Sequence, residues 1–295
     1  MGNDLARAYP VARETFQFAD RYLGFPLSEL MWQGPEEELN DTINTQPALL
    51  VHSIAAFRIF QTYYPDFKPA FVAGHSMGEI SALVASRALE FENALYLVRQ
   101  RGELMKMAGK ESPGGMAAIL GMASEPIEEI CQQSSDVDHR VQIANDNCPG
   151  QIVISGDDIA LGKAIVLARK AGAKRTQRLS ISIAAHSPLM VTAQDEFAKV
   201  VADAPINEPS IPLLGNVTAL PLHSAAEIKA DLNAQLTSPV RWRESVLEMK
   251  RLGVVNYIEI GNGSVLLGLV KRTESSSVRV PFGDIESIAK FLAEK

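Results

Sequence analysis

The sequence contains no hydrophobic run of the roughly 20 residues that a transmembrane helix needs. Its amino-terminal segment, MGNDLARAYP, lacks the apolar core of a signal peptide. Cysteine is scarce, because Cys131 and Cys148 are the only two, and their spacing fits neither a zinc site nor a disulfide framework. We therefore expect no membrane partner, no metal and a reducing, cytoplasmic environment.

Positive charge is also in short supply. Lys and Arg number 28 against 35 Asp and Glu, which gives a formal net charge of −7. We expect no nucleic-acid partner, because general binding to phosphates needs an excess of basic residues. A local basic patch for an acidic partner remains compatible with this balance. The 295 residues, 46% of them hydrophobic, are enough for a large core in one or two domains.

Hydrophobic periodicity predicts alternating helices and strands in the first and last thirds of the chain. We expect a helix over residues 47–64, capped by Asn44 or Thr45, with Pro47 in its first turn. The apolar, glycine-ended segment 69–74 predicts a buried strand. The remaining expected elements are helices at 79–86, 92–108, 187–201, 226–235 and 243–252 and strands at 211–214 and 255–260. This alternation predicts a hydrolase-like α/β core with a mainly parallel sheet and helices on both faces.

The pattern changes between residues 112 and 183. Strands are expected at 116–120, 141–144, 151–155 and 174–183, with helices at 125–133 and 157–171. The order strand-helix-strand-strand-helix-strand is that of the ferredoxin-like unit. We therefore expect residues 112–183 to form a small α+β subdomain inserted into a main domain made of residues 1–111 and 184–295.

The segment GHSMG at residues 74–78 matches Gly-x-Ser-x-Gly between a predicted strand and a predicted helix. That context is the one a nucleophile elbow requires. A tight turn leaves little room for side chains, so glycine is expected to be necessary at both Gly74 and Gly78. The turn would project the Ser76 hydroxyl outward and leave the Met77 amide at a helix N-terminus, where it can stabilise an oxyanion.

A serine nucleophile needs a base. The five histidines are His52, His75, His139, His186 and His223. His186 ends an extended segment and precedes a predicted helix, and the ends of strands line the clefts of open α/β sheets. This position favours His186 as the base. We expect His52 to be a packed core residue, His75 to point away from Ser76 and His139 to be solvated, while His223 lies in a loop. Arg101, which follows an apolar helical run, is either a surface residue or a guanidinium fork for a substrate carboxylate.

At these residues the sequence resembles the malonyl-CoA:acyl-carrier-protein transacylases of fatty acid synthesis and, more distantly, the acyltransferase domains of polyketide synthases. The likeness covers essentially the whole chain, and several separate stretches match in the right order. The matching stretches are 34–39 (GPEEEL), 45–48 (TQPA), 74–79 (GHSMGE), 101–105 (RGELM), 115–119 (GMAAI), 147–151 (NCPGQ), 186–190 (HSPLM), 235–239 (QLTSP) and 259–261 (EIG).

The resemblance implies a role for each matching residue. Ser76 would carry the malonyl group, His186 would be its base and later its acid, and Arg101 would bind the malonyl carboxylate. Gln235 resembles the residue whose backbone carbonyl orients the histidine, and Asn147 resembles a substrate-binding residue of the cleft. The family works by ping-pong transfer, in which malonyl-CoA acylates the serine and the phosphopantetheine thiol of acyl carrier protein then takes the malonyl group. No metal or redox cofactor is implied.

Acyl carrier proteins are acidic, so the resemblance implies a basic rim on this otherwise acidic chain. The candidate residues fall in two adjacent pairs, Lys174 with Arg175 and Lys271 with Arg272.

The sequence departs from the family pattern at two places. Family members begin with a strand followed by a glutamine whose amide is a second oxyanion donor, and we expect such a segment to precede Met1. Many malonyl-specific relatives have Phe before the catalytic histidine, where this chain has Ala185. The smaller side chain leaves room for methylmalonyl-CoA as an alternative substrate, although Met77 favours malonyl.

Two other readings remain. The first is a serine hydrolase, which shares the elbow and would use His223 as the histidine and Asp203 or Asp231 as the acid of its catalytic triad. The second is a truncated, inactive binding module that serves as a docking subunit of a synthase complex.

Overall fold

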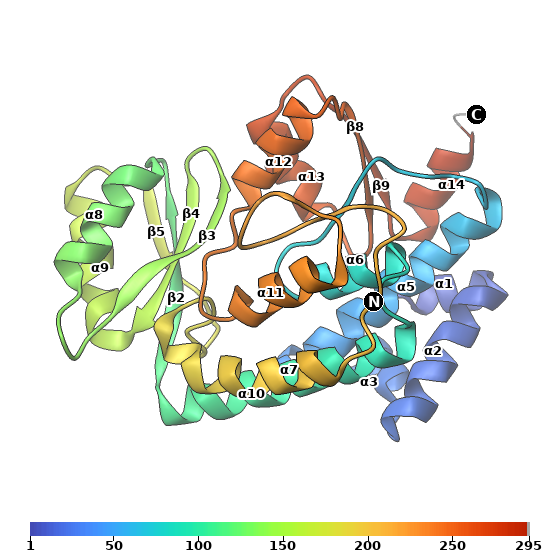
Figure 1. The fold of residues 1–295 in the computed structure, drawn as a ribbon, viewed down its shortest axis with the longest axis horizontal. Helices are drawn as coiled ribbons and strands as arrows, with labels where there is room; N and C mark the ends of the chain where they lie inside the picture. The colour runs from blue at the N-terminus through green and yellow to red at the C-terminus, as the bar shows by residue number, and fades with distance from the viewer. Residues whose placement is uncertain (294–295) are drawn as a thin grey trace.

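The structure is a computed structural model that describes residues 1–293 (Figure 1). It has an α/β fold in which a small unit, at the left of Figure 1, extends from a larger helical body. The helices are α1 (Asn3–Ala8), α2 (Pro10–Leu23), α3 (Leu27–Gln33), α4 (Glu36–Asn40), α5 (Thr42–Tyr63), α6 (Gly78–Ala85), α7 (Phe91–Glu111), α8 (Ser124–Ser134), α9 (Asp158–Lys170), α10 (Val191–Asp203), α11 (Ala225–Gln235), α12 (Trp242–Arg251), α13 (Val265–Thr273) and α14 (Ile285–Ala293).

The strands are short in the larger body and longer in the small unit. They are β1 (Val72–Ala73), β2 (Gly114–Leu120), β3 (Val141–Cys148), β4 (Gln151–Asp157), β5 (Arg175–Arg178), β6 (Leu213–Leu214), β7 (Pro221–Leu222), β8 (Asn256–Ile260) and β9 (Val278–Phe282). No helix within residues 1–293 combines the length and the hydrophobicity needed to cross a membrane.

Helix α5 begins earlier than the sequence predicts. Asp41, not Asn44 or Thr45, is its N-cap, and its carboxylate accepts the amide of Ile43 at 3.2 Å. Pro47 therefore lies inside the helix, where it leaves the Ile43 carbonyl without its usual helical donor. Arg99 of α7 donates to that carbonyl at 3.3 Å, which explains how the proline is tolerated.

The strands of the larger body form two separate sheets within the described residues. In the first, β1 pairs in parallel with β6, and β6 pairs antiparallel with β7. In the second, β8 and β9 are parallel. The antiparallel pair has a local cause, because the amide of Gly215 donates to the carbonyl of Leu220 at 3.1 Å and the chain turns straight back. The single sheet that we expected is thus divided, and one of its connections is a hairpin.

The small unit contains a four-stranded sheet in the order β3-β4-β2-β5, in which every pairing is antiparallel. Helices α8 and α9 pack together against this sheet, around a core of their own that includes Ile127, Leu161 and Ile154. The last strand is shorter than predicted, since only residues 175–178 of the expected 174–183 are paired.

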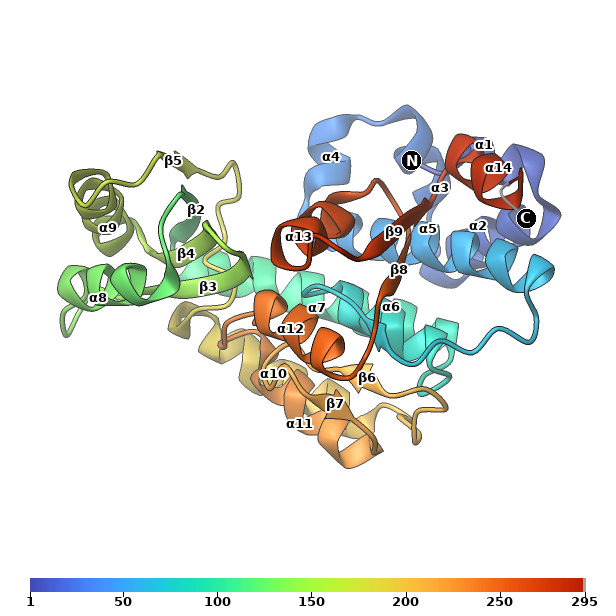
Figure 2. The ribbon, with the colours of Figure 1, turned by 90° about the horizontal axis from the view of Figure 1, so that it is seen from above.

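The largest apolar core is centred on α5 and α7, which run alongside each other through the larger body. A further core joins the two units, because Cys148 at the end of β3 packs with Leu214, Trp242 and Leu269. Figure 2 shows α12 and α13 between the small unit and the rest of the chain. At the opposite end, α1 and α14 lie side by side, and Asp4 accepts the amide of Ile285 at 3.2 Å. The core around Cys148 fixes the small unit beside the C-terminal end of β1, because Ala73 also packs against it.

Candidate active site

The turn between β1 and α6 has the geometry of a nucleophile elbow. Ser76 adopts a left-handed backbone conformation, with φ of 53°, directly before helix α6. A Cβ on Gly74 would lie 1.9 Å from the carbonyl oxygen of Gly78, so only glycine fits at position 74. The expectation that Gly78 is equally necessary is wrong, because a Cβ there would meet no atom within 4 Å. The backbone is therefore too close for a side chain at Gly74 but not at Gly78.

His186 lies beside the Ser76 hydroxyl. The Nε2 atom of His186 lies 2.8 Å from the Oγ of Ser76, and its Nδ1 lies 2.8 Å from the backbone carbonyl of Gln235. A carbonyl can only accept, so Nδ1 carries the proton and Nε2 presents its lone pair to the serine hydroxyl. The backbone carbonyl of Gln235 therefore fixes the tautomer that a base requires.

Burial keeps His186 neutral. Its side chain is almost fully enclosed, and desolvation followed by the positive charge of Arg101 lowers its pKa to about 3 from the usual 6.5. At neutral pH the ring is therefore unprotonated and able to accept the Ser76 proton.

Arg101 lies on the other side of the hydroxyl. Its Nη2 donates to the Oγ of Ser76 at 3.0 Å and to the side-chain oxygen of Gln235 at 2.9 Å, and its Nη1 donates to Gln46 at 2.8 Å. The residue is only 2% exposed, and burial lowers its pKa to about 10, so it stays charged at neutral pH. None of the ion pairs within residues 1–293 includes it. Arg101 is thus a buried cation that lacks a carboxylate partner beside the nucleophile.

Gln235 has a second task that the sequence did not predict. Its side-chain amide donates to the backbone carbonyl of Ser76 at 3.3 Å and to the carboxyl group of Glu79. Glu79 is fully buried, and desolvation and the neighbouring Asp231 charge raise its pKa well above the usual range. Asp231 accepts four hydrogen bonds from the turn at residues 216–218, which hold its carboxylate in place. Gln235 is therefore bonded to Glu79, whose raised pKa favours the neutral carboxyl group, and it is also bonded to Arg101 and to the backbone of the elbow.

One backbone amide at the elbow is free to donate a hydrogen bond to a negatively charged oxygen. The amide of Ser76 is already bonded to the side-chain oxygen of Asn216 at 2.6 Å. The amide of Met77 precedes helix α6 and, within residues 1–293, donates to no protein acceptor. An oxyanion beside Ser76 can therefore bind the Met77 amide at the positive end of the helix dipole.

The small unit reaches the site through β3. Asn147 accepts a hydrogen bond of 2.8 Å from Nε2 of His75, the residue before the nucleophile. Gln142 donates to the carbonyl of His186 at 2.8 Å and to that of Thr237 at 3.0 Å. The side chain of Asn147 is thus occupied by His75, and Gln142 positions the segment that carries the base.

The remaining histidines lie elsewhere. His52 is buried against the carbonyl of Gly283 at 2.9 Å, and His139 pairs with Asp157 at 3.2 Å in the small unit. The ring that bonds to Ser76 belongs to His186 and not to the alternative base His223.

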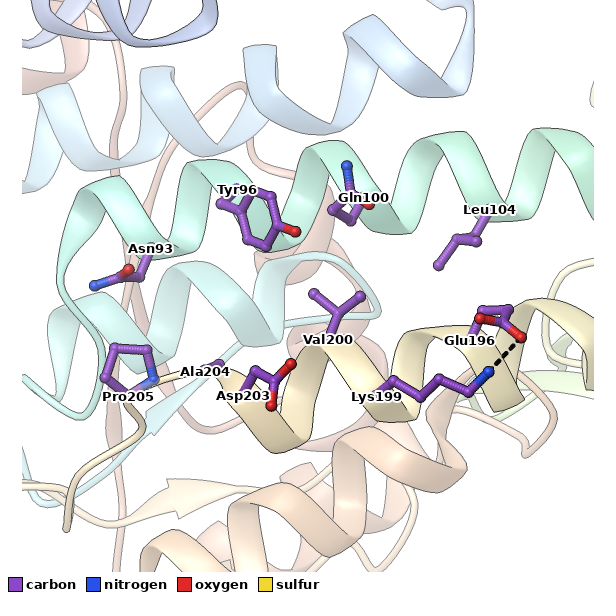
Figure 3. A pocket seen from close by; sticks show the side chains of 10 residues that line it. All are labelled: Asn93, Tyr96, Gln100, Leu104, Glu196, Lys199, Val200, Asp203, Ala204 and Pro205. Carbon is purple, nitrogen blue, oxygen red and sulfur yellow. Dashed lines mark hydrogen bonds and ion pairs between the residues drawn. The ribbon is translucent and has the colours of Figure 1, made fainter.

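A groove of about 320 Å³ lies between α7 and α10 on the outside of the molecule (Figure 3). It contains Asp203, one of the acids considered for the hydrolase, together with Tyr96, Gln100 and the ion pair of Glu196 and Lys199. None of the residues bonded to Ser76 lines it, so the groove is separate from the active site.

Comparison with known proteins decides between the remaining readings. Residues 1–289 match the acyl transferase domain family. The malonyl CoA-acyl carrier protein transacylase of Haemophilus influenzae is 42% identical over 284 residues, covering 96% of this chain and 91% of that protein. The chain belongs to the malonyl CoA-acyl carrier protein transacylase family. The enzyme of that name from Bacillus subtilis is 43% identical over 288 residues, covering 98% of this chain and 90% of its own length.

Solved structures of the transacylase family have the same fold. The structure from Coxiella burnetii superimposes with a TM-score of 0.95 at 37% identity, covering 99% of this chain and 92% of that one. A malonyl-transacylase in complex with a type II PKS acyl-carrier protein gives a TM-score of 0.95 at 39% identity, covering 100% of this chain and 95% of its own.

Besides Gln142, three residues that hold the site were not predicted to have a role. Gln46 and Glu79 fall within the stretches 45–48 and 74–79 that resemble the transacylase family, so the resemblance marks their position without indicating what they do. Asn216 lies outside every matching stretch, and only the folded chain brings it to the elbow.

Proposed function

We propose that this chain transfers the malonyl group of malonyl-CoA to Ser76 and from there to the phosphopantetheine thiol of acyl carrier protein. One arrangement carries the proposal: a single hydroxyl lies between a neutral imidazole and a buried, unpaired guanidinium. The first group supplies a base for acyl transfer, and the second supplies a binding partner for a free carboxylate.

In the first half-reaction, the Oγ of Ser76 attacks the thioester carbonyl while its proton passes to Nε2 of His186. The carbonyl oxygen becomes an oxyanion and accepts the Met77 amide, a type of contact that is worth roughly 3–4 kcal/mol in comparable enzymes. When the intermediate collapses, the carbon–sulfur bond breaks and the imidazolium returns its proton to the departing sulfur of CoA. The product is a malonyl ester on Ser76 and free CoA.

The second half-reaction reverses these roles. His186 removes the proton of the phosphopantetheine thiol, whose sulfur attacks the ester carbonyl of malonyl-Ser76. The ester bond to Oγ then breaks, and the imidazolium protonates Oγ to restore the serine. All proton transfers use one ring, so the ping-pong cycle needs no metal or redox cofactor.

Arg101 is proposed to select a diacid. No carboxylate in the described part of the chain pairs with the guanidinium, so a carboxylate on the acyl group can take that place. A charge-assisted hydrogen bond of this kind is worth about 1.5–3 kcal/mol. Acetyl-CoA offers no such group. We further propose that a methyl branch is tolerated but disfavoured, because Ala185 is small and Met77 is apolar. A single methyl group changes discrimination by about 10- to 200-fold.

We also propose a division of the chain into a main domain, residues 1–111 and 184–295, and a ferredoxin-like subdomain, residues 112–183. The order β2-α8-β3-β4-α9-β5 and the separate core of this unit support the subdomain. The parallel pairs β1–β6 and β8–β9 support a mainly parallel arrangement for the main domain. A cytoplasmic location suits the two free, buried cysteines.

The basic rim is proposed to bind acyl carrier protein. Arg175 lies opposite Leu120 in the sheet, and Leu120 lies opposite Gln151, whose side chain accepts from Arg272 at 2.7 Å. Lys174 and Lys271 are the exposed neighbours of these two arginines. The two basic pairs therefore lie at one end of the small sheet. It is also the end at which β3 carries Asn147 to His75, so the rim borders the site.

Charge reversal tests the rim. Replacing Lys174 and Arg175 by Glu is expected to slow transfer to holo acyl carrier protein while leaving malonyl loading of Ser76 unchanged. Lys199→Glu, a reversal in the outer groove, is the matched control and should affect neither step. Added salt should weaken transfer in the wild type more than in the double variant. Equal transfer rates for the wild type and the double variant would contradict the rim.

A two-stage assay tests the function. The protein is incubated first with malonyl-CoA and then with holo acyl carrier protein, and both proteins are weighed intact after each stage. We expect one malonyl group on the chain and then on the carrier, no adduct with Ser76→Ala, and strongly slowed loading with His186→Ala. Release of free malonate without a carrier at the rate of transfer would indicate a hydrolase. A chain that forms no adduct would be a binding module.

A further inference from the structure

Asn216, which follows strand β6, makes two hydrogen bonds to the backbone of the elbow. Its Oδ1 accepts the amide of Ser76 at 2.6 Å, and its Nδ2 donates to the carbonyl of Gly74 at 2.7 Å. The side chain thus bridges the backbone groups on either side of His75. Asn216 is only 2% exposed, so these hydrogen bonds do not compete with water.

Asn216 is itself anchored. Its amide donates to Asp231 of α11 at 3.0 Å, and its carbonyl accepts the amide of Arg241 at 2.9 Å. Strand β6 ends two residues before Asn216 and pairs with β1, the strand that leads into the elbow. The two hydrogen bonds from Asn216 to Gly74 and Ser76, here called the bridge, therefore connect the nucleophile turn to a fixed part of the main body.

The bridge has two consequences for Ser76. A left-handed conformation is unfavourable for a residue with a side chain, and it persists only where the surroundings enforce it. The bond from Asn216 to the Ser76 amide enforces it, and the resulting turn directs Oγ to His186. Because the same bond occupies the Ser76 amide, the oxyanion is left to the Met77 amide.

We propose that Asn216 is a positioning residue for acyl transfer, which acts through the backbone of Ser76 and does not touch the substrate. This inference rests on the proposed function of Ser76 as the nucleophile. It predicts that loss of the bridge slows the chemical step and leaves substrate binding nearly unchanged.

The test measures single-turnover loading from malonyl-CoA for Asn216→Ala and for a matched control, Thr218→Val. Thr218 belongs to the same turn and donates to the same Asp231 at 3.2 Å, but its side chain does not bond to the elbow. We expect Asn216→Ala to load about 10²-fold more slowly with an apparent KM within about threefold of wild type, because misplacement of about 1 Å costs that much. Thr218→Val should load within about twofold of wild type, because it leaves the elbow in place.

A second variant separates positioning from folding. Asn216→Asp keeps the acceptor for Ser76 but donates to Gly74 only when its carboxyl group is protonated. Burial beside Asp231 raises the pKa of such a group, so loading by this variant, relative to wild type, should recover as the pH is lowered. A role in folding alone would give no such recovery.

The outcomes are distinct. Wild-type loading by Asn216→Ala, or equal slowing in Asn216→Ala and Thr218→Val at equal loss of thermal stability, would overturn the inference. So would the absence of recovery in Asn216→Asp. Reaction of Ser76 with a fluorophosphonate is measured in parallel. If wild type reacts with this probe and Asn216→Ala does not, while neither loads malonyl, the proposed function fails and the positioning role stands.

Discussion

Replacement of Arg101 by alanine gives the sharpest prediction about specificity. The guanidinium is buried beside Oγ of Ser76 and bonded to Gln46 and Gln235, and no carboxylate among residues 1–293 forms an ion pair with it. Its removal takes away the group proposed to bind the malonyl carboxylate. It also leaves two buried amide oxygens without their donor, which costs about 1–3 kcal/mol of folding free energy each.

The two costs differ in how they affect substrates. The unpaired amides and any change in the pKa of His186 affect malonyl-CoA and acetyl-CoA alike. They therefore cancel in the ratio of the two kcat/KM values. The lost charge-assisted hydrogen bond acts on malonyl-CoA alone and is worth about 1.5–3 kcal/mol. At about 1.4 kcal/mol per factor of ten, the preference for malonyl over acetyl should fall by about 10- to 150-fold.

The assay compares loading of Ser76 from each thioester by intact mass. Arg99→Ala is the matched control, because Arg99 lies on the same helix, pairs with Glu103 at 2.8 Å and makes no bond to Ser76. The control should keep the wild-type ratio. An unchanged malonyl-to-acetyl ratio in Arg101→Ala would refute the proposed role of the guanidinium, whatever happened to the absolute rates.

Three further predictions follow from the same cluster. Because the pKa of His186 is lowered to about 3, kcat/KM for loading should stay flat as the pH falls from 7 to 5, and half-loss near the usual 6.5 would contradict a buried neutral base. Glu79→Gln should keep loading within about threefold, since the amide retains an oxygen that can accept from Gln235. Because the pKa of Glu79 is raised in the folded state, its contribution to stability is fully present below the usual 4.5 and is lost as the pH rises. The thermal stability of Glu79→Gln relative to wild type should therefore increase with pH. A difference that stays constant with pH would refute this. Gly74→Ala should abolish folding or loading while Gly78→Ala retains both, as circular dichroism and intact mass would report, and equal tolerance of the two would refute the one-sided elbow.

The elbow could be predicted because it is local. A glycine-ended apolar segment, a serine and a helix lie within a few residues of each other, and the backbone geometry of that turn constrains which residues fit. Even so, the sequence could not distinguish Gly74 from Gly78. The difference depends on where each missing Cβ would point, which is set by the helix that follows.

The partners of the serine depend on long-range contacts, and the residues alone indicated them poorly. His186 lies 110 positions from Ser76, and its place at a strand end favoured it among five histidines without deciding the choice, which the family resemblance then supported. Asn216 lies 140 positions from Ser76 and has no spacing or neighbouring motif that marks it. A neutral amide carries no charge pattern, so only the pairing of β1 with β6 reveals that it reaches the elbow.

The sheets of the main body were predicted least well. Strands β1 and β6 are two residues long, too short for an alternating or continuous apolar pattern to define their ends. The small unit was predicted better, since its strands β2, β3 and β4 are seven or eight residues long and each is followed by a clear turn or helix signal.

The central claim is that Ser76 becomes acylated because His186 removes its proton. The most direct measurement is peptide mapping by mass spectrometry after brief exposure of wild type and His186→Ala to malonyl-CoA. The account predicts one malonyl group on the peptide that contains residue 76 in wild type and almost none in the variant. A malonyl group on any other residue, or equal labelling of the two proteins, would contradict it.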